Sequence, residues 1–263
     1  MASGTFTPYS TGVEFFGTKP TWIPDELDIQ RILSYQTYEQ IYWNVPDIFK
    51  VALRGTNNLP VYIPSARTII DTTNRYVAAQ LQVVCTGTDA EAAQMALNDL
   101  MKRERYRSKF MGKKRYGLIQ GDSLWHVTAD PTKPVGSRIR LTALDPGMYF
   151  PITDDEDVDR VIGCHLVEQI VTADGPRIRR LTYRKGEQRA DGTTPITVEE
   201  GIFLLDKWSG PDDNPETVLQ QETVLPDQIT ALPVYHTKNS EQPGDPFGSS
   251  EIRGLERIMS AIN

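Results

Sequence analysis

Few residues of this sequence have the types and spacing that catalysis or metal binding commonly requires. The three histidines, His126, His165 and His236, lie far apart, and no H-x-x-x-H, C-x-x-C or two-histidine-one-carboxylate spacing occurs. Zinc and other transition metals are usually held by such closely spaced ligands. We therefore predict no metal site, and we interpret each histidine as a half-buried residue of a strand.

Nucleotide-binding and hydrolase motifs are also missing from the sequence. It contains no Walker A motif, no G-x-G-x-x-G and no G-x-S-x-G. The tripeptide Gly121-Asp122-Ser123 is interpreted as a turn between a helix and a strand. A hydrolase that uses Asp122 or Asp145 with His126 is a hypothesis that no spacing supports. We predict no catalytic residue, no cofactor and no enzymatic activity.

An acidic run, Asp154–Asp159, has the carboxylates that a calcium loop would need. An EF-hand loop that begins at Asp155 requires glycine at its sixth position and a bidentate glutamate at its twelfth. The sequence has Arg160 and Leu166 at these positions. We therefore interpret the run as a solvated hairpin loop.

The densest positive charge lies between residues 102 and 115, where Glu104 is the only acidic residue. The basic residues are Lys102, Arg103, Arg105, Arg107, Lys109, Lys113, Lys114 and Arg115. Together with the interleaved Tyr106 and Phe110 they could hold phosphates or stack on bases. Successive helical residues are about 100° apart, however, so some of these side chains would face protein. Two interpretations stay open: a subunit contact or solvated helix face, and a nucleic-acid contact.

Composition limits the classes of protein that remain. The 263 residues are enough for one large or two ordinary domains. A formal net charge of −7 argues against binding nucleic acid through the whole surface, because such proteins carry excess lysine and arginine. No window approaches 18 uninterrupted apolar residues, so no membrane span is expected. The N-terminus has neither the basic head nor the apolar core of a signal peptide.

The two cysteines, Cys85 and Cys164, both lie in apolar segments. We interpret them as buried free thiols, with a disulfide as the alternative. Free thiols predict a reducing, cytosolic setting.

The first half of the chain has helical periodicity. Glycine and proline interrupt residues 1–24, which we interpret as an N-terminal arm. A capping box at Thr88–Glu91 is predicted to begin the third helix, and Gly121 is predicted to end it. That helix is predicted to turn Ala93, Leu97, Leu100 and Met101 inward. The predicted helices span residues 25–43, 65–81 and 88–120, the last with a break near Arg107–Ser108.

From Leu124 onward the apolar period changes to two, which is typical of strands. Short turns separate the strands, which favours an antiparallel meander over parallel units. Residues 209–231 are interpreted as a polar connector. The predicted fold class is therefore α+β, with helices, then a meander, then the start of a long helix. The predicted strands span residues 124–130, 137–145, 148–153, 160–172, 177–185 and 201–209.

The helix at the C-terminal end of the sequence is predicted to begin at Ser249 or Ser250. Five apolar residues fall at three- and four-residue steps and would share one face: Ile252, Leu255, Ile258, Met259 and Ile262. A helix of about 13 residues is marginal alone. We expect this face to pack against later chain or an adjacent subunit, and we expect the natural chain to continue.

Four segments, in this order and spacing, resemble portal proteins of tailed bacteriophages, of the siphovirus type. The segment at 96–130 resembles a helix pair that ends in G-(D/E)-(S/A) before a strand. The segment at 233–263 is similar to the portal stretch in which P-V-Y leads through a loop to G-x-S-(E/D) and an amphipathic helix. The four segments are residues 31–50, 62–83, 96–130 and 233–263.

The resemblance implies the wing portion of a ring, commonly a dodecamer, at one vertex of the capsid. Double-stranded DNA would be packaged and ejected through this ring. The implied partners are other copies of the chain, the major capsid protein and possible scaffold, the terminase large subunit and a head-tail adaptor. The implied location is the virion, after assembly in the host cytoplasm. The implied parts are an arm (1–24), a helical wing part (25–120), a β-rich wing part (121–245) and the start of a stem helix (246–263), without clip, crown or channel loop.

Overall fold

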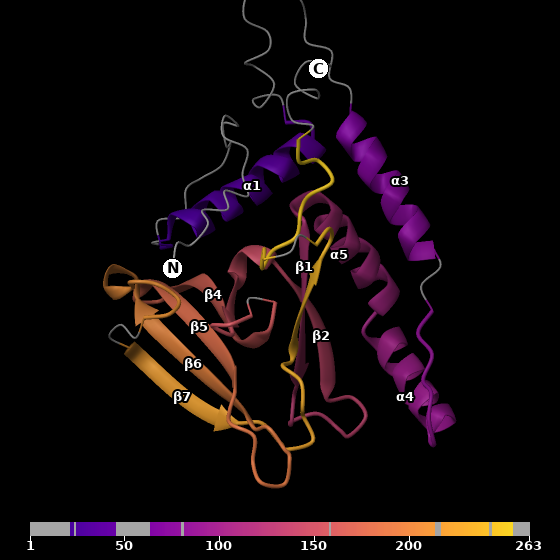
Figure 1. Cartoon of the computed structure of the whole chain (residues 1–263), viewed down its shortest axis with the longest axis vertical. Helices are drawn as coiled ribbons and strands as arrows, with labels where there is room; N and C mark the ends of the chain where they lie inside the picture. Colours follow the sequence, from indigo (N-terminus) through magenta and orange to yellow (C-terminus); the bar gives the residue numbers. More distant parts are fainter. Residues whose placement is uncertain are drawn as a thin grey trace, which may run out of the picture.

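The computed structural model describes residues 22–23, 25–45, 64–79, 82–157, 159–213, 217–241 and 244–254. The fold is α+β, as predicted: helices come first along the chain, and two antiparallel sheets follow (Figure 1). The helices are α1 (Glu26–Tyr42), α3 (Ser65–Ala79), α4 (Ala90–Arg103) and α5 (Tyr106–Gln120). Among the described residues, no helix is both long and apolar enough to cross a membrane. Residues 1–21, most of the predicted arm, lie outside the description.

Local signals explain two of the helix ends. The Asp25 carboxylate begins α1 by accepting hydrogen bonds from the N–H groups of Leu27, at 2.8 Å, and Asp28, at 3.1 Å. Gly121 ends α5 in the left-handed region, with a φ of 100°, where glycine is favoured. The sequence predicted both of these ends.

Two predictions about α4 and α5 are wrong. Helix α4 begins at Ala90, and its N-cap residue Asp89 makes no side-chain capping bond, so the capping box does not form. The break between α4 and α5 lies at Glu104 and Arg105, three residues earlier than expected, and Arg105 has a φ of 50°. Of the four α4 residues predicted to point inward, three are half-buried and Ala93 is exposed.

The strands form two sheets. Strands β3 to β7 form a five-stranded meander, whereas β8 returns to pair with β1 in a three-stranded sheet of order β2-β1-β8. The strands are β1 (Asp122–Ala129), β2 (Ile139–Leu144), β3 (Tyr149–Thr153), β4 (Val161–Thr172), β5 (Gly175–Lys185), β6 (Ile196–Leu204), β7 (Thr217–Val224) and β8 (Val234–Lys238).

Strand β7 contradicts the prediction of a polar connector at 209–231. It pairs with β6 from Thr217 to Val224, although all of its residues are exposed. Because neither face of β7 is buried, its sequence shows no alternation of apolar and polar residues, and the period-two signal is lost.

The five-stranded sheet is covered on both faces around β4 and β5. One face carries Val167 and Ile178, which belong to the same buried cluster as Ile29 of α1. The other face carries Leu166 and Tyr183, which cluster with residues of the three-stranded sheet such as Leu124. Alternate residues of a strand point to opposite faces, so each strand supplies both clusters.

The segment 244–254 packs back onto the helices. Glu251 N–H donates to Leu118 O at 3.0 Å, and the Ser250 hydroxyl donates to Ile119 O, so this segment satisfies carbonyls at the end of α5. A Cβ atom on Gly121 would lie 2.7 Å from Gly248 O, so the two chain segments cross too closely for a side chain there.

The predicted terminal apolar face is described only at its first residue. Ile252 is buried in a cluster with residues of α1, α3 and α5, and it lies in a turn at residues 251–254. This residue therefore packs against the chain's own helices. The other four residues of the face, Leu255, Ile258, Met259 and Ile262, lie outside the described residues.

Candidate functional site

Basic residues of the α4–α5 region cover the outer edge of β2. Lys109 Nζ donates to Leu141 O at 2.6 Å, and Lys113 Nζ donates to Leu144 O. Glu104 accepts the Leu141 N–H at 3.1 Å and the Lys109 ammonium at 3.0 Å. The bond from Leu141, with Lys109 beside it, holds the pKa of Glu104 below its usual value. An edge strand exposes backbone donors and acceptors, and these side chains satisfy them on β2.

Three more cations of the same run bind within the chain. Arg103 donates to the first carbonyl of β2 at 3.4 Å, and Lys114 donates to Asn239 Oδ1 at 3.2 Å. Arg115 forms an ion pair with Asp71 at 3.1 Å. Five of the eight predicted contact residues therefore serve the fold. The exposed residues that have no such partner within the described part of the chain are Lys102, Arg105 and Arg107.

A buried carboxylate, Asp122, lies at the start of β1. Its sequence position did not predict that it connects several elements of the fold. Asp122 is 0% exposed. It accepts hydrogen bonds from the Tyr35 hydroxyl at 2.6 Å and from the Gly248 N–H at 2.7 Å, and its Oδ1 lies 2.6 Å from His236 Nε2. These contacts join α1, β1, β8 and the segment 244–254 at one point. The sequence spacing of Asp122 and His236 does not indicate that they interact, because it is the pairing of β1 with β8 that brings them together.

The hypothetical hydrolase pairs are not formed. His126 Nε2 lies 2.8 Å from the Tyr183 hydroxyl, and Asp145 accepts the Gly147 N–H at 2.8 Å. Burial, followed by the charge of Arg179, lowers the pKa of His126. The expectation of half-buried histidines is met by His236, whereas His126 and His165 are buried.

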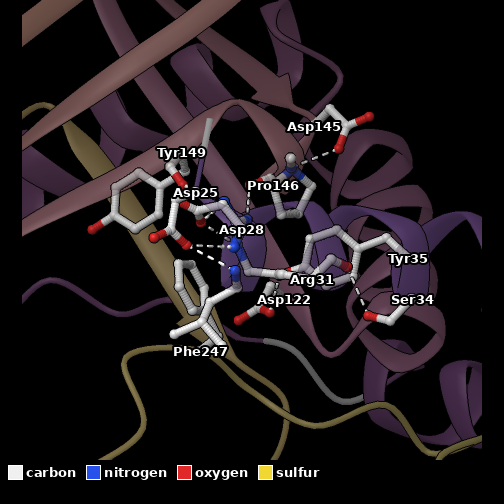
Figure 2. A network of polar contacts seen from close by, with 12 residues as sticks. Asp25, Asp28, Arg31, Ser34, Tyr35, Asp122, Asp145, Pro146, Tyr149 and Phe247 are labelled. Carbon is white, nitrogen blue, oxygen red and sulfur yellow. Dashed lines mark hydrogen bonds and ion pairs between the residues drawn. The ribbon is translucent and has the colours of Figure 1, made fainter. Parts of the chain in front are cut away.

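A second buried ionic group, Arg31, ties α1 to the turn between the two sheets (Figure 2). Its side chain is 1% exposed and contacts Asp28 at 2.9 Å. It also donates to the carbonyl oxygens of Pro146, at 3.0 Å, and Tyr149, at 3.2 Å. The guanidinium carbon lies 4.2 Å from the centre of the Phe247 ring. The guanidinium thus covers the edge strand β3, as the lysines cover β2.

No protein-family model matches the sequence, and no curated protein matches it either.

The structure places the acidic run in the loop between β3 and β4. The Asp157 N–H donates to Asp154 O at 3.3 Å, and the Asp154 N–H donates to Arg160 O at 2.9 Å, which closes the loop. In the described part of the chain, no group of three His, Cys, Asp or Glu residues could hold a metal ion. Cys85 and Cys164 are both free, which confirms the thiol interpretation, although Cys85 is only half-buried.

On opposite sides of the molecule, α4 and β7 present surfaces that no other described residues cover (Figure 1). Helix α4 has no buried residue, and Met95 on it is 66% exposed. Strand β7 is exposed on both faces, including Val218 and Leu219, and forms the outer edge of the five-stranded sheet. The strand contains no proline or lysine, which are devices that commonly protect such edges. Both surfaces are suited to contacts with another chain.

Proposed function

We propose that this chain is the wing part of a portal protein of a tailed bacteriophage, a non-enzymatic subunit of a ring through which double-stranded DNA passes. The observation that carries the proposal is the pair of uncovered surfaces, α4 and β7, on opposite sides of the subunit. A ring requires head-to-tail contacts between two different patches of the same chain. The order of the four portal-like segments supports the same assignment.

The charge distribution supports a passive conduit. The chain has a net charge of −7, and five of the eight cations of its densest basic run are bound within the fold, three of them to acidic residues. Weak attraction to DNA lets a polyanion slide past without being held. In this proposal the terminase large subunit, the head-tail adaptor and the major capsid protein with possible scaffold are partners. The virion is its final location.

The ring is tested by measuring the mass of the natural gene product and by electron microscopy. We expect closed rings, commonly of dodecameric size. Met95→Glu on α4, or Val218→Lys with Leu219→Lys on β7, should each prevent ring formation while the subunit stays folded. The matched control is Val171→Lys, a change at an exposed hairpin residue outside both surfaces.

Mixing the two damaged chains makes the test specific to head-to-tail contacts. Each chain keeps one intact surface, so the mixture should form one-to-one dimers that do not extend. A natural gene product that stays monomeric at all concentrations would remove the proposal, and so would rings unaffected by both sets of changes.

A second candidate function, a nucleic-acid-binding module built on residues 102–115, rests on the three unpaired cations Lys102, Arg105 and Arg107. Three phosphate contacts predict a slope of log K against log salt of about −3, whereas all eight cations would give about −7. We expect a Lys102, Arg105 and Arg107 triple alanine variant to abolish this weak binding. Changing Lys113, Lys114 and Arg115 to alanine should leave the slope unchanged. A slope near −7 in DNA titrations would instead mean that all eight cations contact DNA, including the five that are bound within the fold.

A further inference from the structure

Three cations at the junction of α4 and α5 are not neutralised within the subunit. Lys102 lies in the last turn of α4, Arg105 lies between the two helices, and Arg107 lies in the first turn of α5. All three residues are exposed, and none forms an ion pair with a residue that the structure describes. The neighbouring acidic residue, Glu104, is already bound to Lys109 at 3.0 Å. The junction therefore presents three positive charges at the surface.

The position of these cations is unfavourable for an isolated subunit. The N-terminus of a helix carries a partial positive charge, which repels cations. The first turn of α5 contains no acidic residue, and no side chain caps its N-terminus. Arg105 also has a φ of 50°, in the left-handed region that glycine adopts without penalty. An arginine held there at a cost to the subunit indicates a partner for its side chain outside the subunit.

On the other side of the molecule, carboxylates gather on β7 and on the loop before it, residues 209–213. Glu222 lies directly opposite Glu199 in the register of β7 with β6. Like charges that face each other across two strands repel. Glu199 is paired with Arg180 at 3.0 Å, whereas Glu222 is exposed and has no ion pair within the described ranges. A cation from outside the subunit would therefore be favourable at Glu222.

The loop before β7 adds two carboxylates to the same face of the sheet. Arg180 holds the loop there by donating to two of its carbonyl oxygens, at 2.8 Å and 2.5 Å. Asp212 and Asp213 are exposed, and Asp212 Oδ1 lies 3.3 Å from His165 Nε2. Burial, followed by the charge of Arg180, lowers the pKa of His165 to about 4, so at neutral pH this ring does not neutralise Asp212. Arg184 adds one positive charge near His165, which leaves the carboxylates in excess.

The charged residues lie at similar distances from the apolar residues of the two surfaces. Met95 and Lys102 are seven residues apart, which places them on one face of α4, about 10 Å from each other. Val218 and Glu222 are four residues apart on β7, or about 13 Å along the strand. A contact between Met95 of one copy and Val218 of another therefore brings Lys102 within reach of Glu222. Such a contact has the apolar centre and polar rim that are typical of protein interfaces.

We propose that the three cations of the α4–α5 junction form ion pairs with the three carboxylates beside β7 in a second copy of this chain. The cations are Lys102, Arg105 and Arg107, and the carboxylates are Asp212, Asp213 and Glu222. This inference rests on the proposed ring, because it names the charged residues of the contact between α4 and β7, which lie on opposite sides of the subunit (Figure 1). Complementary charges steer two copies into one orientation and oppose contacts between like surfaces.

Two substitutions test the contact without weakening the subunit. Arg105→Gly removes a cation and relieves the left-handed backbone, so the subunit should be about as stable in chemical denaturation. Glu222→Lys places a cation opposite Glu199, which also favours the folded subunit. We nevertheless expect weaker assembly of the natural gene product, by about threefold to fivefold per contact for Arg105→Gly. The loss should be larger for Glu222→Lys, because it opposes like charges. Light scattering against protein concentration measures both, and Glu156→Lys in the exposed β3–β4 loop is the matched control.

A charge swap makes the test specific to this pairing. Arg105→Glu and Glu222→Lys should each weaken assembly, whereas the two changes in one chain should restore it, and added salt should weaken assembly of the natural chain. Rings that form equally well in all variants and at all salt concentrations would overturn the ion pairs and leave the proposed ring standing. A natural gene product that stays monomeric would remove both. An Arg105→Gly chain that assembles normally but loses DNA binding would overturn the inference and assign the cations to nucleic acid.

Discussion

Replacing Arg31 with methionine is expected to lower the free energy of unfolding by about 3–5 kcal/mol, because it removes one partner of a buried ion pair. Asp28 would keep its charge without the guanidinium, and the carbonyl groups of Pro146 and Tyr149 would lose their donor. The contact with the Phe247 ring is lost as well. Chemical denaturation followed by circular dichroism measures the difference.

The pH dependence identifies the cause of this loss. Burial already raises the pKa of Asp28 while Arg31 opposes the shift, so removing Arg31 raises that pKa further. A raised folded-state pKa favours the protonated carboxyl, which means that the deficit should shrink as pH falls through that value. Arg31→Lys keeps the charge but not the forked geometry, and should lose less stability. A methionine variant as stable as the natural chain at neutral pH would contradict the role assigned to this network.

Replacing Asp122 with alanine is expected to cost a similar amount, about 3–5 kcal/mol, because three donors lose their buried acceptor at once. The Tyr35 hydroxyl, the His236 ring and the Gly248 N–H all converge on this carboxylate. Alanine removes the acceptor that these three groups share and also creates a cavity. The variant should therefore unfold at a clearly lower denaturant concentration in the same assay.

Two milder substitutions distinguish the contribution of the carboxylate to stability from that of one of its partners. Tyr35→Phe removes the hydrogen bond from the Tyr35 hydroxyl to Asp122 and should cost about 1–2 kcal/mol. Asp122→Asn keeps the volume but replaces one acceptor oxygen with a donor, so its cost should fall between the other two. If alanine and phenylalanine variants lose equal stability, Asp122 is not the junction described above.

Periodicity predicted the helices and most strands because their apolar residues face one core. Helix α3 and strands β4 and β5 carry patterns of this kind, and the structure places them as expected. The break at Glu104 and Arg105 was misplaced because its cause is a tertiary one, the bond from Leu141 to Glu104. Strand β7 was missed for the opposite reason, since neither of its faces is buried.

The candidate sites were less predictable than the fold. The basic run is plain in the sequence, but its use in covering β2 depends on where α5 lies against that strand. Asp122 and His236 are 114 positions apart, and only the register of β1 with β8 brings them together. Arg31 resembles an ordinary surface residue of a helix, because nothing local shows that the inter-sheet turn will bury it.

The contacts of residues 244–254 bear on how this protein is made on the ribosome. Carbonyls at the end of α5 are satisfied by Ser250 and Glu251, and the cluster formed by α1, α3 and α5 includes Ile252. Domains generally fold from the N-terminus during synthesis, as units. Here the helices that are translated first cannot complete their packing until residue 252 has left the exit tunnel. The nascent chain therefore stays partly folded until then.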